Sequence, residues 1–247
     1  MIRVIMFDLG NTLVRESDLT LFPHVPEALR TLGRFTDDAE RKLPLCLVSN
    51  FPQKLPVPTA ELPQVFASFL EILDKVGLTN FFQPVERCVT LSAHSGMAKP
   101  HAACFATALR RLGLATGFDS CFFITEEAEH VAHVRQLGMQ ALQFAGHQTP
   151  APAGSDFTDW AEAPLRIART GFPDNPDNLK WALRGFLEAT RDLLVSNVEG
   201  SERHFDVQAT TRVPLPGQPS GILNGVLFEV PIKLSVHLDD VGRVVDV

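Results

Sequence analysis

Four short segments of the chain carry polar side chains whose chemistry fits together. An aspartate can attack a phosphoryl group and form an acyl phosphate. A serine hydroxyl can hold the transferring oxygens, and a lysine can neutralise the negative charge on nucleophile and phosphate. Two carboxylates suit Mg²⁺, a hard ion that prefers oxygen ligands. The segments are FDLGNTL with Asp8 and Thr12, LVSN with Ser49 and Asn50, GMAKP with Lys99, and TEE at 125–127.

Three of these segments end or follow an apolar run that is typical of a buried strand. The predicted strands are Ile2–Phe7, Leu43–Val48, Arg87–Leu91, Ser120–Ile124 and Gln140–Phe144. The predicted helices between them are Pro26–Phe35, Gln64–Val76, Ala102–Leu112 and Ala128–Leu137. This alternation indicates a Rossmann-like α/β fold, a three-layer sandwich with a mostly parallel sheet. If the strands are parallel neighbours, the polar groups meet at the carboxyl edge of the sheet, where ligands bind in such folds.

The composition changes after Phe144. The segment GHQTPAPAGSD is typical of a linker or surface loop, and residues 178–195 have apolar residues near helical spacing. From Arg203 onward the pattern predicts antiparallel hairpins with a turn at PLPGQPSG, and Pro231 indicates an edge strand or a bulge. We therefore expect a Rossmann-like domain with its linker over 1–171 and an appended α+β module, a helix plus β-hairpins, over 172–247.

Composition and charge argue against several classes of protein. The 247 residues carry a net charge of −7, which argues against binding to nucleic acid or to an anionic membrane. No apolar stretch reaches the roughly 18 residues of a membrane span, and the N-terminus does not resemble a secretory signal. None of the four cysteines forms a CxxC pair, and Cys46 and Cys121 lie in apolar runs. These features favour a cytoplasmic protein with reduced cysteines.

Taken together and in order, the four segments resemble the motifs of the haloacid dehalogenase (HAD) superfamily, best known for Mg²⁺-dependent phosphatases. FDLGNTLV is similar to its first motif, LVSN to its second, SAHSGMAKPHAACFATALRRLGL to its third and FFITEEAEHVAHVRQLGM to its fourth. The resemblance covers about residues 1–145. It implies a Mg²⁺-dependent hydrolase of phosphate esters that works through an aspartyl-phosphate intermediate.

The resemblance also assigns roles to individual residues. It implies that Asp8 is the nucleophile and a metal ligand, and that the metal is also held by the backbone carbonyl of Gly10 and by Glu126. Lys99 is then a catalytic residue that holds phosphate with Ser49. Thr12 supports the nucleophile loop, and Asn50 supports the second motif.

Two positions depart from the family pattern. The phosphatases of the family usually have aspartate two residues after the nucleophile, as the general acid and base, and here Gly10 has no side chain. Losing that step costs roughly 10²–10⁴-fold unless another group replaces it. Thr125-Glu126 stands where two aspartates are usual, and the longer Glu126 moves the carboxylate by roughly 1 Å, which Mg²⁺ tolerates poorly.

Each of these residues also has a structural interpretation. A strand-end aspartate before Gly10 can belong to a simple turn, Ser49–Asn50 can cap a turn, and Lys99 and Glu126 can be solvated residues at helix starts. His130 and His133, with Glu126 and Glu129 nearby, could form a transition-metal cluster, but we favour a solvated helix surface. His101 follows Lys99-Pro100 and could lie at the rim of the site.

The sequence therefore supports three functional hypotheses. The first is phosphate-ester hydrolysis. The second is a pseudo-enzyme that serves as a binding or scaffold protein, and the third is carbon–halogen hydrolysis, which usually needs a lid. The short interval between the first two motifs leaves no room for a large lid, so an open site would suit a macromolecular or bulky substrate, unless the C-terminal module covers it. The expected partner is a phosphorylated small molecule or an exposed phosphorylated group. The β edges of the C-terminal module could form a homodimer.

Overall fold

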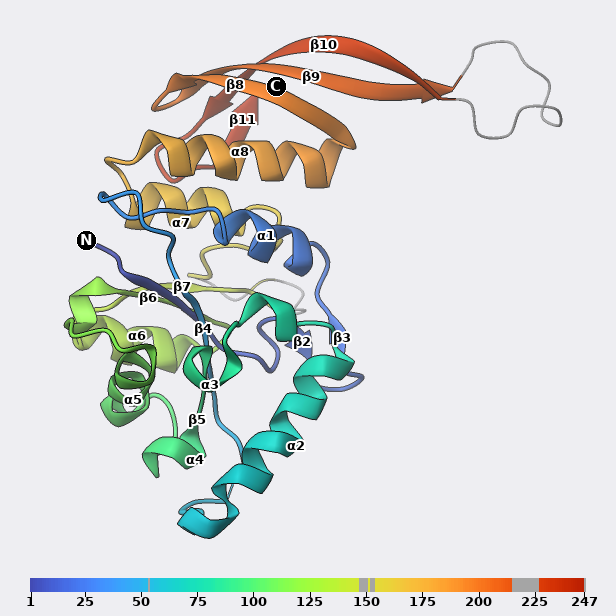
Figure 1. Ribbon diagram of the computed structural model, residues 1–247. Helices are drawn as coiled ribbons and strands as arrows, with labels where there is room; N and C mark the ends of the chain where they lie inside the picture. Colours follow the sequence, from blue (N-terminus) through green and yellow to red (C-terminus); the bar gives the residue numbers. More distant parts are fainter. Residues whose placement is uncertain (53, 147–150, 152–153, 215–226, 247) are drawn as a thin grey trace, which may run out of the picture.

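A five-stranded sheet forms the centre of the N-terminal half of the chain (Figure 1). In this computed structural model, residues 1–52, 54–146, 151, 154–214 and 227–246 are described. All neighbouring strands are parallel, in the order β5-β4-β1-β6-β7. Their bounds are β1 Val4–Phe7, β4 Leu45–Ser49, β5 Val89–Leu91, β6 Cys121–Thr125 and β7 Gln140–Gln143. The Rossmann-like α/β prediction is confirmed.

The apolar runs become strands because both faces of the sheet are covered. β1, β4 and β6 are buried along their whole length, as expected for a parallel sheet with helices on both faces. In Figure 1, α1 (Val25–Leu32) and α7 (Ala163–Gly171) lie on one side, and α5 (Ala102–Leu112) and α6 (Ala128–Gln136) on the other. The remaining helices of this half are α2 (Leu62–Lys75), α3 (Val85–Cys88) and α4 (Ser92–Ser95).

A small hairpin follows β1 that the sequence did not predict. It consists of β2 (Val14–Arg15) and β3 (Thr20–Leu21). The chain reaches it through a tight turn in which the carbonyl of Leu9 accepts the N–H groups of residues 12, 13 and 14. Asn11 has a φ of 49° in this turn, a left-handed conformation that asparagine tolerates better than most residues. The hairpin and α1 both lie in the interval between β1 and β4.

The C-terminal part contains a second, antiparallel sheet with the strand order β11-β10-β9-β8. Its strands are β8 Leu193–Ser201, β9 His204–Pro214, β10 Leu227–Leu238 and β11 Val244–Asp246. The predicted helix over 178–195 is α8 (Pro176–Arg191), so its last residues were wrongly assigned and begin β8 instead. The change occurs at Asp192, whose φ of 50° ends the helix. Most of the predicted PLPGQPSG turn lies outside the described residues.

Pro231 lies on β10, which is an inner strand in the order of the sheet, so the expectation of an edge strand or a bulge at this residue is wrong. It lies opposite Thr210 of β9, whereas β11 pairs with β10 only at His237 and Leu238. One side of β10 therefore has no strand partner at Pro231 among the described residues, and a residue without an N–H is tolerated there.

α8 joins the two sheets into one layered arrangement. It lies between the antiparallel sheet and the pair α1 and α7 (Figure 1). Buried Asn178 of α8 accepts the Thr36 N–H at 3.0 Å and donates to the Thr36 carbonyl at 2.9 Å. The buried apolar residues of both halves belong to one continuous cluster. The division at residue 172 stays a prediction.

Two further expectations concern the whole chain. Among the described residues, no helix combines the length and hydropathy needed to cross a bilayer. Cys46, Cys88, Cys104 and Cys121 are all free and buried, and burial raises the pKa of the Cys121 thiol to about 12. The prediction that Cys46 and Cys121 are core residues is confirmed.

Candidate active site

Asp8 and Lys99 form a buried ion pair beside the carboxyl edge of the parallel sheet. Asp8 directly follows β1, and its N–H donates to the carbonyl of Ile124 at 2.9 Å. The Lys99 ammonium contacts Asp8 Oδ1, and the two side chains are only 1% and 8% exposed. The Leu9 N–H also donates to Oδ1, at 2.7 Å, and Lys99 Nζ lies 5.7 Å from the centre of the Phe123 ring. The first and third motifs thus meet at one point.

Thr125 and Glu126 connect the fourth motif to the first. The Thr125 hydroxyl lies 3.3 Å from both Asp8 Oδ2 and Glu126 Oε2. The Thr12 hydroxyl donates to the Glu126 carboxylate and accepts the Glu126 N–H at 3.1 Å. The family resemblance implies Glu126 as a metal ligand. In the structure its carboxylate is instead hydrogen-bonded to the hydroxyl of fully buried Thr12. Burial and the charge of Asp8 raise the pKa of Glu126 to about 7.

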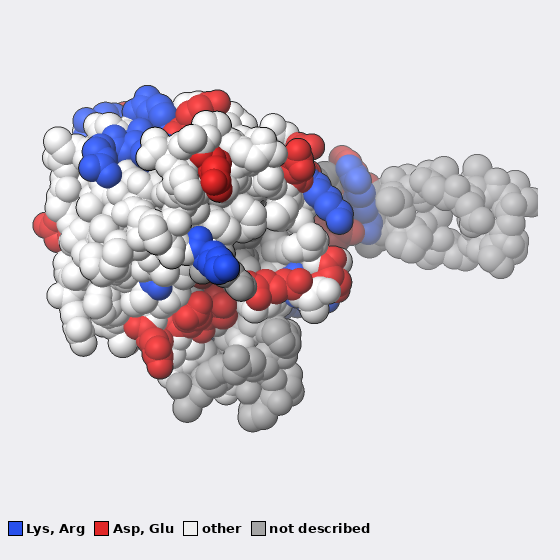
Figure 2. All heavy atoms as spheres, turned by 90° about the horizontal axis from the view of Figure 1, so that it is seen from below, with Lys and Arg blue, Asp and Glu red and all other residues white. Residues whose placement is uncertain are grey.

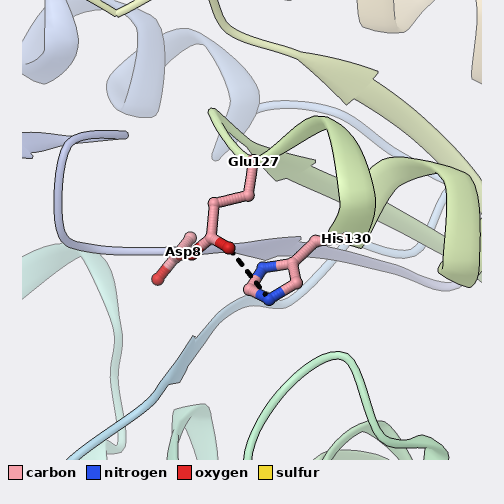
Figure 3. A group of neighbouring side chains, drawn as sticks. All are labelled: Asp8, Glu127 and His130. Atoms are coloured by element: carbon pink, nitrogen blue, oxygen red, sulfur yellow. Dashed lines mark ion pairs between the residues drawn. The ribbon is translucent and has the colours of Figure 1, made fainter.

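Glu127 and His130 complete a group of possible metal ligands with Asp8 (Figure 3). One donor atom from each lies within 4.8 Å of the others, and His130 Nε2 is 3.2 Å from Glu127 Oε2. Glu127 precedes α6 and its side chain is half exposed, whereas His130 on α6 is buried. The expected solvated surface is thus wrong for His130, because its ring turns inward toward Asp8.

The surroundings shift the proton affinity of both new members. Burial and the nearby Asp8 charge raise the pKa of Glu127. Burial and the positive charge of Lys99 lower the pKa of His130, so its imidazole is held in the neutral form that can bind a metal. Two carboxylates fit Mg²⁺, while an imidazole nitrogen is more typical of transition metals. The donor set of Asp8, Glu127 and His130 fits a divalent cation.

Ser49 and Asn50 occupy different positions relative to the ion pair. Ser49 is the last residue of β4 and is buried. Asn50 Oδ1 accepts the Lys99 N–H at 2.6 Å, and its Nδ2 donates to the Lys99 carbonyl at 3.4 Å. Asn50 therefore positions the backbone that carries Lys99 and joins the second motif to the third.

Trp160 is a supporting residue that sequence reasoning missed. Its indole N–H donates to the Thr12 carbonyl at 2.9 Å, and the residue is fully buried. It lies far along the chain, after the linker, where no periodic pattern connects it to the first motif. His101, considered as a rim residue, instead caps α5, because its Nδ1 accepts the Ala103 N–H at 3.1 Å.

Acidic and basic side chains are interspersed on the face shown in Figure 2, and one group of acidic side chains lies in the lower part of the view. On this face the described residues form no continuous basic surface of the kind that binds a nucleic-acid backbone.

Comparisons with known proteins identify similar structures but no close relative. No family model matches the chain, and no curated protein matches it. Solved structures of HAD-superfamily hydrolases and haloacid dehalogenases do match. A HAD family hydrolase from Deinococcus radiodurans with bound phosphate and sodium is 16% identical, with a TM-score of 0.47 over 69% of this chain and 96% of that one.

Two other matches are weaker. L-2-haloacid dehalogenase from Xanthobacter autotrophicus is 15% identical, with a TM-score of 0.42 over 61% of this chain and 80% of that one. YfnB from Bacillus subtilis bound to magnesium is 11% identical, with a TM-score of 0.39 over 62% of this chain and 90% of that one. These low similarities leave the functional argument to the geometry of the site.

Proposed function

We propose that this protein is a HAD-like hydrolase of phosphate esters in which Asp8 is the nucleophile. The observation that carries the proposal is the buried Asp8–Lys99 ion pair beside the carboxyl edge of the sheet. Such a pair puts a positive charge beside the carboxylate, where a phosphoryl group would approach it.

The proposed reaction has two steps, phosphorylation of Asp8 and hydrolysis of the aspartyl phosphate. An Asp8 carboxylate oxygen attacks phosphorus, and the bond to the ester oxygen breaks, leaving an aspartyl phosphate and an alkoxide that takes up a proton. Water then attacks phosphorus, the bond to Asp8 breaks, and inorganic phosphate leaves with Asp8 restored. Lys99 balances negative charge in both steps, and in this proposal the Ser49 hydroxyl holds phosphate oxygens.

A divalent metal, proposed to be Mg²⁺, would be held by Asp8 and Glu127, with His130 as a nitrogen donor. It would withdraw negative charge from the phosphate. In this proposal Glu127 replaces Glu126 in the ligand set, because Glu126 is bonded to Thr12. Glu126 then positions the loop that carries Glu127.

The pseudo-enzyme remains the second candidate function, and one observation favours it. The Glu126 carboxylate is tied to Thr12 and Thr125, so the carboxylate expected from the family resemblance is engaged within the protein. In that case the fold would bind a phosphorylated group without turnover.

The proposed substrate is a phosphorylated small molecule or an exposed phosphorylated group. The half-exposed side chain of Glu127, close to Asp8, supports access to the site from solvent. The cytoplasmic location stays a prediction.

A broad screen of phosphate esters at saturating Mg²⁺ tests the proposal. We expect phosphate release that is abolished by a chelator and by Asp8→Asn, with the circular dichroism spectrum of the variant unchanged. No release from any ester, or equal turnover by Asp8→Asn, would contradict the nucleophilic role and favour the binding protein.

A further inference from the structure

We propose that Glu16 supplies the acid–base carboxylate that position 10 lacks. The inference rests on the proposed phosphate-ester hydrolysis, and it concerns the proton that each step must deliver or remove. The resemblance to the family suggests an acidic side chain at position 10, but this chain has Gly10 there. The structure brings a carboxylate to the same place from another element.

The geometry around Gly10 carries this inference. A Cβ atom built on Gly10 would lie 2.1 Å from Glu16 Oε1 and 2.9 Å from the carboxyl carbon Cδ. The Glu16 carboxylate thus occupies the space into which a side chain at position 10 would extend. Gly10 does not have the positive φ that requires glycine, so its backbone would accept a side chain if Glu16 were absent.

The hairpin after β1 holds Glu16 at this position. Glu16 directly follows β2, and its N–H donates to Asn11 Oδ1 at 3.2 Å. Gly10 also bridges to Val14, at the start of β2, which keeps the hairpin close to the nucleophile loop. The charge of Glu16, like that of Asp8, contributes to the raised pKa of Glu127. Asp8 and Glu16 therefore both lie close enough to Glu127 to act on its carboxyl group.

Glu16 would then move one proton in each direction. As Asp8 attacks phosphorus and the P–O bond to the leaving group breaks, the Glu16 carboxyl gives its proton to the departing oxygen, which leaves as an alcohol. The resulting Glu16 carboxylate takes a proton from water as the water oxygen attacks the aspartyl phosphate. Phosphate and the Asp8 carboxylate are released, and Glu16 is protonated again.

The dependence of the rate on the leaving group tests this role. The p-nitrophenolate of an aryl ester such as p-nitrophenyl phosphate leaves without protonation. The alkoxide of an alkyl phosphate needs a proton to leave. For Glu16→Gln we expect kcat/KM for an alkyl phosphate to fall by roughly 10²–10³-fold. The initial burst of p-nitrophenol should be retained, followed by slow turnover because water attack lacks its base. Asp18→Asn, which changes another exposed carboxylate of the same hairpin, is the matched control and should leave both rates unchanged.

A second variant separates chemistry from structure. Gly10→Asp combined with Glu16→Ala should recover at least about tenfold of the lost alkyl-phosphate activity, because the carboxylate returns from position 10. An equal fall in kcat/KM for aryl and alkyl esters in Glu16→Gln, or no fall for either, would overturn the inference while the proposed function stands. A wild-type protein without burst or turnover on both esters would overturn the proposed function itself, and the role of Glu16 with it.

Discussion

At the scale of single residues, the proposed chemistry depends on how a carboxylate is kept reactive below the surface. Asp8 is nearly buried and contacts the Lys99 ammonium, while the Leu9 N–H and the Thr125 hydroxyl occupy its two oxygens. A buried charge needs such partners, because burial without them is costly. These partners hold the Asp8 carboxylate at a position where one of its oxygens lies within 4.8 Å of donor atoms of Glu127 and His130.

Replacing Lys99 tests this arrangement. For Lys99→Met we expect phosphatase kcat/KM to fall by at least about 10²-fold, because a preorganised charge opposite the phosphoryl group is lost. Lys75→Met, which changes an exposed lysine of α2, is the control and should leave kcat/KM unchanged. Retained activity in Lys99→Met would remove the lysine from the mechanism.

The residues Asp8, Lys99 and Thr12 could be selected from the sequence because each lies in a short motif at a predicted strand end or helix start. Glu127, His130 and Glu16 could not be ranked in this way. Sequence spacing does not tell which of two adjacent glutamates turns toward Asp8, or that a hairpin returns Glu16 to Gly10. The i, i+3 pair visible in the sequence was His130 and His133, with Glu126 and Glu129 nearby, whereas the structure brings Glu127 and His130 together.

At the scale of elements, strands could be predicted from their apolar runs, whereas the end of a helix depends on the conformation of its last residue. β1, β4 and β6 were predictable because strands buried on both faces are almost wholly apolar. The end of α8 was not, because residues 193–195 are apolar and continue the helical spacing, while the break depends on the left-handed conformation of Asp192.

The start of α4 provides a prediction on pH. His94 Nδ1 accepts the Leu91 N–H at 2.9 Å, and burial together with nearby Arg111 lowers the pKa of His94 from 6.5 to about 4. Below pH 6.5 the unfolded chain binds a proton that the folded chain does not, so this contribution to stability is lost as the pH falls toward 4. His94→Asn keeps an acceptor without titrating, so its free energy of unfolding should fall less over this range.

Denaturant titrations at several pH values measure this difference. His133→Asn, which removes another histidine from a helix, serves as the control and should follow the wild type. Parallel pH profiles for the wild type and His94→Asn would contradict the assigned role of His94.

The contact between α8 and the segment after α1 provides a second prediction. Asn178→Ala removes two hydrogen bonds to the half-buried backbone of Thr36, whose carbonyl keeps the Asn175 amide as a donor at 3.3 Å. We expect the free energy of unfolding to fall by about 1–3 kcal/mol, since the Thr36 N–H loses its partner. Gln208→Ala, at an exposed position of β9, should change it little. Two separate unfolding transitions in the wild type would show instead that the two halves are not coupled through α8.

At the scale of the whole molecule, the layers are a parallel sheet with helices on both sides, then α8, then the antiparallel sheet (Figure 1). α8 is covered on both sides because it packs against α1 and α7 and also against β8. The general fold class follows from strand–helix alternation, but the position of the second sheet depends on long-range packing that no local pattern encodes.

The antiparallel sheet leads to a prediction about assembly. β8 forms one edge of the sheet, and Leu194 on that strand is 47% exposed. Because free β edges favour pairing, we predict a homodimer through the C-terminal sheet. Light scattering should then give twice the chain mass of 27.2 kDa, and charged substitution of Leu194 should produce monomers. A monomer at all concentrations would refute this assembly.

The most direct test of the account is detection of the phosphorylated nucleophile. The protein is mixed with a phosphate ester and Mg²⁺, quenched in acid within the first turnover, and digested for mass spectrometry. The account predicts one added phosphoryl group on the peptide that contains Asp8, and none in Asp8→Asn. Steady release of phosphate while this peptide remains unmodified at every quench time would contradict it.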